Sequence, residues 1–314
     1  MEVNGRLWSV VFPAILSQLV LLMMETISMM FVGRLNNSFA TAGVGLAIIF
    51  VNLTTHSTLM GLNNAISVLV PVAYGQCDYR ECERVLNRGR ILCLIFYAPL
   101  FFVQLSCFRI LTTLGIDEEV ARYAHDFGLY LFLAMGFHMQ FDCYKQYLNG
   151  TNQSRIVQFA VSSTILIHLA LCYTMTYYLD LEVVGVGIAT MTTCFLNMLF
   201  TMLYTWKMTV YEVKPLPSAP LSLLQTEDLK IYMGISGPSI LMLCADWWAY
   251  EAIVIMAATI SVGAVGSMAI SYNYLFLIYS FPCGFQIGAV SVIGNVIGEE
   301  NEQLGKVLSM MSFV

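Results

Sequence analysis

This chain of 314 residues is 58% hydrophobic and only 11% charged, with a mean hydropathy of +0.74. Soluble domains are about half apolar and a quarter charged, so the composition argues against a soluble protein and predicts a polytopic membrane protein. The formal net charge of −6 gives no support to nucleic-acid binding, which requires a basic surface.

Eight apolar segments are long enough to cross a bilayer, which takes about 20 residues of helix. They are residues 8–31, 39–60, 90–111, 123–144, 156–178, 183–206, 234–260 and 264–288. The first is not interpreted as a cleaved signal peptide, because its apolar core is too long and carries Glu25. The sequence therefore predicts an all-α membrane protein with about eight transmembrane helices.

Basic residues concentrate in alternate connections between these segments, and connections rich in Lys and Arg stay in the cytoplasm. The predicted inner set is Arg6, Arg80, Arg84, Arg88, Arg90, Lys145, Arg155, Lys207, Lys214, Lys230 and Lys306, against Arg34, Arg109 and Arg122 outside. The outer connections also hold the acidic run at 117–119. The amino terminus is therefore predicted to be cytoplasmic.

The sequence contains signs of a duplication. Pro13 and Pro238 open similar segments 225 residues apart, and the glycine-rich segments at 61–75 and 284–298 begin 223 residues apart. Six predicted helices separate the copies, so both copies point the same way, as in a parallel repeat. We predict a six-helix amino-terminal lobe over 1–208, a cytoplasmic linker over 209–230, and the first two helices of a second lobe over 231–314. By the same arithmetic, the second lobe lacks about 120 residues.

Two acids, Asp246 and Glu251, stand near the middle of segment 234–260. An acidic side chain there costs roughly 2.5–3.5 kcal/mol on insertion scales, so such residues are candidates for function. Five positions apart, the two acids lie about 140° apart around a helix and do not share one face. We predict that they bind the coupling proton, although pairing with polar groups of the helices is the simpler alternative. Glu25 fits an interfacial role as well as a functional one.

Aromatic residues surround these acids and can bind an organic cation through their ring faces, although aromatics are also common packing residues in membranes. They are Trp247, Trp248, Tyr250, Tyr272 and Tyr274. The nine cysteines show no regular spacing and are interpreted as small buried hydrophobes. The histidines lack ligand spacing, so neither a metal nor a cofactor is expected.

Several segments together resemble the multidrug and toxic compound extrusion (MATE) transporters, especially the eukaryotic ones. The segments are 27–35, 46–54, 61–76, 244–251 (CADWWAYE) and 290–301. The resemblance implies twelve helices in two lobes around a V-shaped cavity, and cation-coupled export of organic cations or metabolites.

The resemblance also implies site residues. Asp246 stands where eukaryotic members usually have Glu, and Glu251 and Tyr250 match the second acid and its neighbour. Gln18 and Asn52 match polar residues of the cavity. With the aromatic residues Trp247 and Tyr272, these complete the predicted substrate site. Two departures are Ser28, where many bacterial members have Asp, and the lack of helices 9 to 12.

The leading hypothesis is a secondary active antiporter that exports organic cations, drugs or metabolites in exchange for protons. The alternatives are a lipid or oligosaccharide flippase of related fold, or an inactive truncated transporter fragment. A flippase is expected to line its cavity with Arg or Lys, and no basic residue stands in the middle of an apolar segment. An enzyme is not expected, because no nucleophile with a base, paired catalytic acids or metal motif is present. The sequence leaves open proton or sodium coupling, and the plasma membrane or an endomembrane such as a vacuole.

Overall fold

The computed structural model describes residues 2–35, 37–208, 225–260 and 262–300, and every regular element in those ranges is helical. Some side chains between 254 and 273, that of Tyr272 among them, also lie outside the description. The elements are α1 (Glu2–Gly33), α2 (Ser38–Val51), η1 (Asn52–His56), α3 (Ser57–Gly75), α4 (Tyr79–Leu105), α5 (Cys107–Thr113), α6 (Glu118–Gly150), α7 (Ser154–Tyr173), η2 (Thr174–Tyr178), α8 (Glu182–Met208), α9 (Thr226–Ile260) and α10 (Val262–Gly298).

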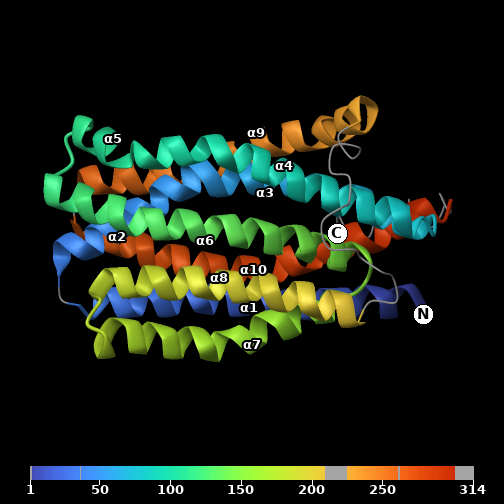
Figure 1. Ribbon diagram of the computed structural model, residues 1–314, viewed down its shortest axis with the longest axis horizontal. Coiled ribbons are helices and arrows are strands. Elements are labelled where there is room, and N and C mark those ends of the chain that lie inside the picture. The colour runs from blue at the N-terminus through green and yellow to red at the C-terminus, as the bar shows by residue number, and fades with distance from the viewer. Residues whose placement is uncertain (1, 36, 209–224, 261, 301–314) are drawn as a thin grey trace.

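The described elements form eight long rods and the short helix α5, because α2, η1 and α3 continue into one another and α7 continues into η2 (Figure 1). The prediction of about eight transmembrane helices is thereby confirmed. Rods that are long and apolar enough to cross a membrane by composition include Leu7–Gly33, Ser38–Gly75, Tyr79–Leu105, Ser154–Tyr178, Glu182–Lys207 and Tyr274–Gly298.

Several predicted boundaries were wrong, and the predicted second helix, for example, runs on to Gly75, well past residue 60. The third helix begins at Tyr79, well before residue 90, where Asp78 caps it by accepting a hydrogen bond from the Glu81 N–H at 3.0 Å. The four arginines that their charge placed in a loop are helical, namely Arg80, Arg84, Arg88 and Arg90. The seventh helix begins at Thr226, so the end of the predicted linker 209–230 is also helical, while 209–224 lies outside the described residues.

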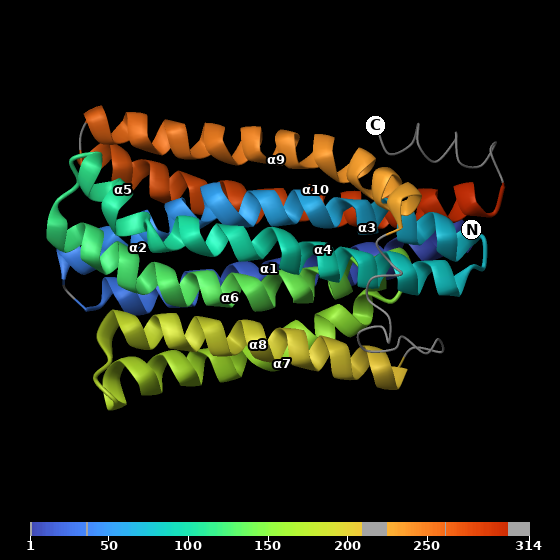
Figure 2. The ribbon, with the colours of Figure 1, turned by 45° about the horizontal axis from the view of Figure 1, so that its top comes forward.

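Figure 2 shows α9 beside α10 and α3, and α10 also packs on α1. Helix α6 lies centrally and contacts α2, α3, α4 and α8. Two clusters of buried hydrophobic residues form the core. One gathers around Leu62, Ile66, Leu86 and Tyr147, and the other around α2 and the first half of α6. The candidate site lies on the seam where α9 packs on η1 and α3.

The repeated glycine segments meet in space and pack closely. Gly75 of α3 lies against the backbone of Asn295 in α10, and Gly298 lies against Val72, so an added Cβ would overlap backbone atoms at both positions. The alternative of local unwinding is excluded for these described residues, since both segments are helical. Close helix approach is therefore the role of these small residues.

A second pair of contacts repeats under the predicted duplication. Gly61 of α3 packs against Ile240 of α9, and Gly284 of α10 packs against Ile15 of α1. The two glycines are 223 residues apart and the two isoleucines 225, matching the offsets of the repeat. Each helix pair thus reproduces the other with the partners exchanged, as a repeat about an axis along the membrane normal requires. This exchange supports the two-lobe division, which stays a prediction.

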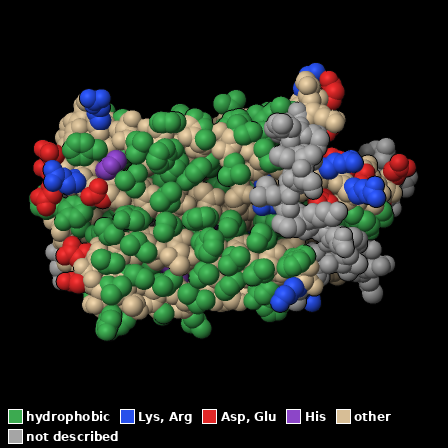
Figure 3. All heavy atoms as spheres, in the orientation of Figure 1, with side chains coloured by type: hydrophobic (Ala, Val, Ile, Leu, Met, Phe, Trp, Pro, Cys, Tyr) green, Lys and Arg blue, Asp and Glu red, His purple; other side chains and the backbone are tan. Residues whose placement is uncertain are grey.

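On the face that Figure 3 shows, hydrophobic side chains cover the middle and charged side chains gather at the two ends. Such a belt is expected of a protein whose middle lies in hydrocarbon. Acidic residues at 117–119 lie at one end, where α6 begins. The opposite end holds the connection between α3 and α4, with exposed Cys77 and Arg80.

The topology prediction can be tested with the native Cys77, which is exposed in the α3–α4 connection. A membrane-impermeant maleimide should label Cys77 only after the cells are permeabilised, because that connection belongs to the basic inner set. A cysteine introduced as Asp117→Cys should react in intact cells, and Cys77→Ser gives the background. Labelling of both sites from the same side would overturn the orientation.

Candidate functional site

One stripe of α9 makes the contacts that place the site. Residues at every fourth position share a helix face, and here that face meets α4, α3 and η1. At its start, Asp228 Oδ2 lies 2.6 Å from Arg88 Nη2 of α4. Next, Tyr232 Oη and Ser236 Oγ both donate to the Leu62 carbonyl of α3, at 3.1 and 3.0 Å. Further along, Cys244 Sγ donates to Ser57 Oγ at 3.5 Å, and Trp248 Nε1 donates to the Leu53 carbonyl of η1 at 3.0 Å.

The two predicted acids occupy different environments on α9. Glu251 is buried, with 7% of its surface exposed, and the Asn52 side chain of η1 lies beside its carboxylate. Asp246 is exposed on the side of α9 near Tyr279 of α10, with which it interacts electrostatically. Five positions apart on α9, the two acids thus lie in different surroundings.

The predicted substrate residues are only partly brought together. Trp247 lies on the η1 side, with its ring 5.1 Å from that of His56 and 6.2 Å from Phe276 of α10. Tyr250 is 43% exposed. Gln18 lies elsewhere, at the contact of α1 with α10, where its amide donates to Cys283 Sγ at 3.5 Å. The Tyr272 side chain lies outside the described residues.

A buried charged group near the site was missed by sequence reasoning. Lys145 Nζ lies 2.7 Å from Asp142 Oδ1, and both side chains are at most 9% exposed. Asn63 of α3 donates to the second oxygen of Asp142 at 2.9 Å. His138, one turn before Asp142, stacks on His56 with ring centroids 5.8 Å apart. The spacing of His138, Asp142 and Lys145 on one helix face was the available signal.

Arg88 and Arg90 are buried within the first half of α4, which corrects their predicted place in the connection before the third helix. Arg88 is neutralised by Asp228, and Glu81 lies 3.8 Å away. Arg90 donates to Gln140 Oε1 at 3.2 Å and lies 4.9 Å from the centre of the Tyr144 ring. The charges can be buried because each has polar or aromatic partners on a neighbouring element.

Ser28 belongs to a buried hydrogen-bond network on the far side of α1. His168 of α7 contacts Ser28 Oγ at 3.1 Å through Nε2 and Thr193 Oγ1 at 2.8 Å through Nδ1. Glu25 is exposed and interacts electrostatically with Cys194 of α8. In the described part of the chain, no three His, Cys, Asp or Glu side chains come close enough to hold a metal ion.

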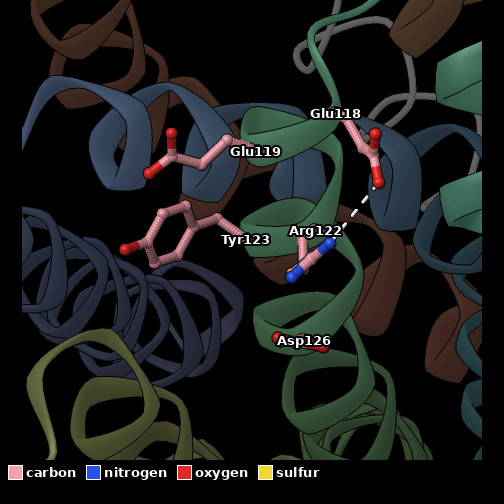
Figure 4. Close-up of a pocket in the computed structure, with 5 residues that line it drawn as sticks. All are labelled: Glu118, Glu119, Arg122, Tyr123 and Asp126. Atoms are coloured by element: carbon pink, nitrogen blue, oxygen red, sulfur yellow. Dashed lines mark hydrogen bonds and ion pairs between the residues drawn. The ribbon is translucent and has the colours of Figure 1, made fainter.

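A polar hollow lies at the N-terminal end of α6 and is separate from the site on α9. Figure 4 shows Glu118, Glu119, Arg122, Tyr123 and Asp126 around it, with the Arg122 guanidinium 3.4 Å from Glu118. All five come from the first turns of α6, and most are exposed. We interpret this hollow as a solvated helix end, because it does not reach the buried acid of α9.

Comparisons with known proteins agree with this architecture. The MatE family model matches residues 13–174 and 238–314. The chain is 26% identical over 313 residues to multidrug and toxin extrusion protein 1 of Mus musculus, covering 96% of this chain and 53% of that protein. It is 27% identical over 306 residues to Protein DETOXIFICATION 48 of Arabidopsis thaliana, with 96% and 56% covered. The chain thus spans about half the length of these curated relatives.

Solved structures show the same fold. The crystal structure of the eukaryotic MATE transporter AtDTX14 matches with a TM-score of 0.89 at 20% identity, over 99% of this chain and 69% of that one. A MOP superfamily transporter from Pyrococcus furiosus matches with a TM-score of 0.81 at 17% identity, over 99% and 68%. With the family model matched on both sides of the 209–230 connection, this integral, multi-pass membrane protein belongs to the MatE family, the multidrug and toxin extrusion proteins.

Proposed function

We propose that the protein is a secondary active antiporter that exports organic cations, drugs or metabolites in exchange for protons. The observation that carries the proposal is Glu251, a buried acid near the middle of the apolar segment 234–260 of α9, which faces Asn52 across the seam with η1. An acid at that depth is costly unless it has a function or a partner. Asn52 is neutral, so the negative charge of Glu251 stays available to a proton or to a cationic substrate.

The mechanism follows from competition for one carboxylate. Ionised Glu251 attracts a cation, and Trp247 and Tyr250 offer aromatic faces beside it. A proton that binds Glu251 from outside removes the charge and releases the cation. Rocking of the two proposed lobes about this site exposes it to each side in turn. Asp246 contributes a second carboxylate on a different face of α9, about 140° around the helix from Glu251.

A flippase remains the second candidate, but the buried basic residues do not favour it. A flippase for pyrophosphate-linked cargo needs cationic side chains that are free to meet the phosphates. Arg88 and Lys145 are paired with Asp228 and Asp142, and Arg90 is held by Gln140 and Tyr144. The fold is shared with MOP superfamily transporters as a class, so it does not decide between the two activities.

We also propose that transport requires helices beyond this chain. Asp246 is exposed at membrane depth beside Met242 and Tyr279, which are 58% and 55% exposed. A carboxylate that faces lipid is costly, so this face is suited to cover by further helices or a water-filled cavity. The share of the relatives that the chain spans, about half, supports the same proposal.

The test is export of ethidium from proteoliposomes with an imposed pH gradient. The protein as its gene encodes it should move ethidium against its gradient, and this export should stop when a protonophore is added. Residues 1–314 alone should show little export. A sodium gradient provides the second arm. Ethidium transport that follows the sodium gradient and ignores the pH gradient would overturn proton coupling. Equal export by both forms would overturn the need for further helices.

A further inference from the structure

We propose that Trp248 is a positioning residue, which holds the η1 turn so that Asn52 faces Glu251. The inference rests on the proposed function, because it concerns the residues that prepare Glu251 for proton binding. Trp248 contacts η1 through its indole N–H, which donates to the Leu53 carbonyl at 3.0 Å. The rest of the side chain is largely on the surface, since Trp248 is 55% exposed.

The η1 turn is unusual for its position. It is a π-helical turn in the middle of the rod Ser38–Gly75, and the Ser57 N–H bonds to the Asn52 carbonyl, five residues earlier. Such turns are less regular than α-helix and often occur at functional sites. Threonine hydroxyls bond back to the helix on either side, from Thr54 to the Phe50 carbonyl at 2.7 Å and from Thr58 to the Thr54 carbonyl at 3.2 Å. These back-bonds are known to bend helices.

The Leu53 carbonyl collects two side-chain donors at this turn. Ser57 Oγ approaches it at 3.3 Å from the next turn of the same rod, and Trp248 Nε1 at 3.0 Å from α9. Trp248 is thus the donor that ties this carbonyl to another helix. Because Leu53 follows Asn52 directly, a tie at Leu53 also restrains where the Asn52 side chain points.

The contacts between η1 and α9 form neighbouring rungs. Asn52 meets Glu251 and Leu53 meets Trp248, and Trp248 and Glu251 lie three residues apart on one side of α9. His56 against Trp247 is a further contact one turn along η1. Loss of the Trp248 rung removes a hydrogen bond between α9 and η1, and the Asn52 rung is the nearest to it.

The position of Asn52 matters because its amide can serve both states of Glu251. The NH₂ group donates to the ionised carboxylate, and the amide oxygen accepts from the protonated acid. A displaced Asn52 would stabilise neither state as well, and the pH dependence of export would change. A residue that supports only packing would not affect this pH dependence.

The experiment is a double-mutant cycle on export in proteoliposomes that contain the protein as its gene encodes it. The variants are Trp248→Phe, which keeps a ring and loses the donor, Asn52→Ala, and both together. Each single change should slow pH-driven ethidium export about threefold to tenfold, the range of one lost hydrogen bond, and shift the pH of half-maximal export. The double variant should show no more than the larger single effect, since residues in one network are not additive. Additive effects would overturn the proposal.

Two controls separate positioning from packing. Incorporation of β-(3-benzothienyl)alanine at 248 keeps the bicyclic shape without the N–H, so it should behave like Trp248→Phe. Behaviour like the unmodified protein would overturn the proposal, even if Trp248→Phe folds poorly. Trp206→Phe, at an exposed position of α8, should leave the pH dependence unchanged.

Glu251→Gln in the same preparation keeps the two proposals apart. Full pH-driven export by Glu251→Gln would overturn the proposed function. Loss of export in Glu251→Gln, with additive effects of Trp248→Phe and Asn52→Ala, would overturn the positioning role alone.

Discussion

Replacement of Glu251 by Gln is expected to reduce pH-driven export to the level of liposomes without the protein. Gln has nearly the same shape and can still bond to Asn52, but it cannot take up a proton or attract a cation. The loss should therefore occur without loss of insertion or folding. The measurement is ethidium export under an imposed pH gradient, normalised to the amount of protein in the membrane.

Asp246→Asn is expected to reduce the same export strongly but less completely. Asp246 is exposed and Glu251 is buried, so Glu251 has the more restricted environment for proton exchange. Asp is also one methylene shorter than Glu, which shortens its reach. Glu119→Gln, in the exposed first turn of α6, is the matched control. Unchanged export by the double variant Asp246→Asn, Glu251→Gln would refute the assignment of both acids.

The second large effect is expected on stability. Lys145→Met leaves Asp142 buried beside α3 without its ion partner, which lies at 2.7 Å. Loss of one partner of a buried pair costs about 3–5 kcal/mol, because an uncompensated charge remains. Asn63 continues to donate to Asp142, but one neutral donor does not replace a full charge. The expected result is a clear fall in the thermal midpoint of the purified protein in detergent.

Two further variants test the cause of this loss. Lys145→Met combined with Asp142→Leu removes both charges and should recover much of the stability, as apolar replacements of buried pairs often do. Lys230→Met breaks a pair with Glu227 whose side chains are 66% and 82% exposed, and it should cost no more than about 1 kcal/mol. Equal thermal midpoints for Lys145→Met and Lys230→Met would contradict the interpretation.

The number of long helices follows from the amino-acid sequence alone, because the length of an apolar run is a local property of the chain. It also identified the family and singled out Glu251, since an acid within such a run is conspicuous without any knowledge of its neighbours. Local patterns failed at helix ends. The positive charges of Arg84, Arg88 and Arg90 predicted a loop, although Arg88 and Arg90 are buried in α4.

Which polar residues meet depends on how the helices pack. The pairing of Asn52 with Glu251 and of Arg88 with Asp228 joins residues far apart in the chain, and such contacts depend on which helix faces pack together. The same packing separated Gln18 from the acids and placed it against Cys283. The π-helical turn was also beyond the sequence, because nothing in Asn-Leu-Thr-Thr-His requires it. The turn is held by donors from its own rod and by the Trp248 N–H of α9, and the Trp248 donor reaches it only when the helices have assembled.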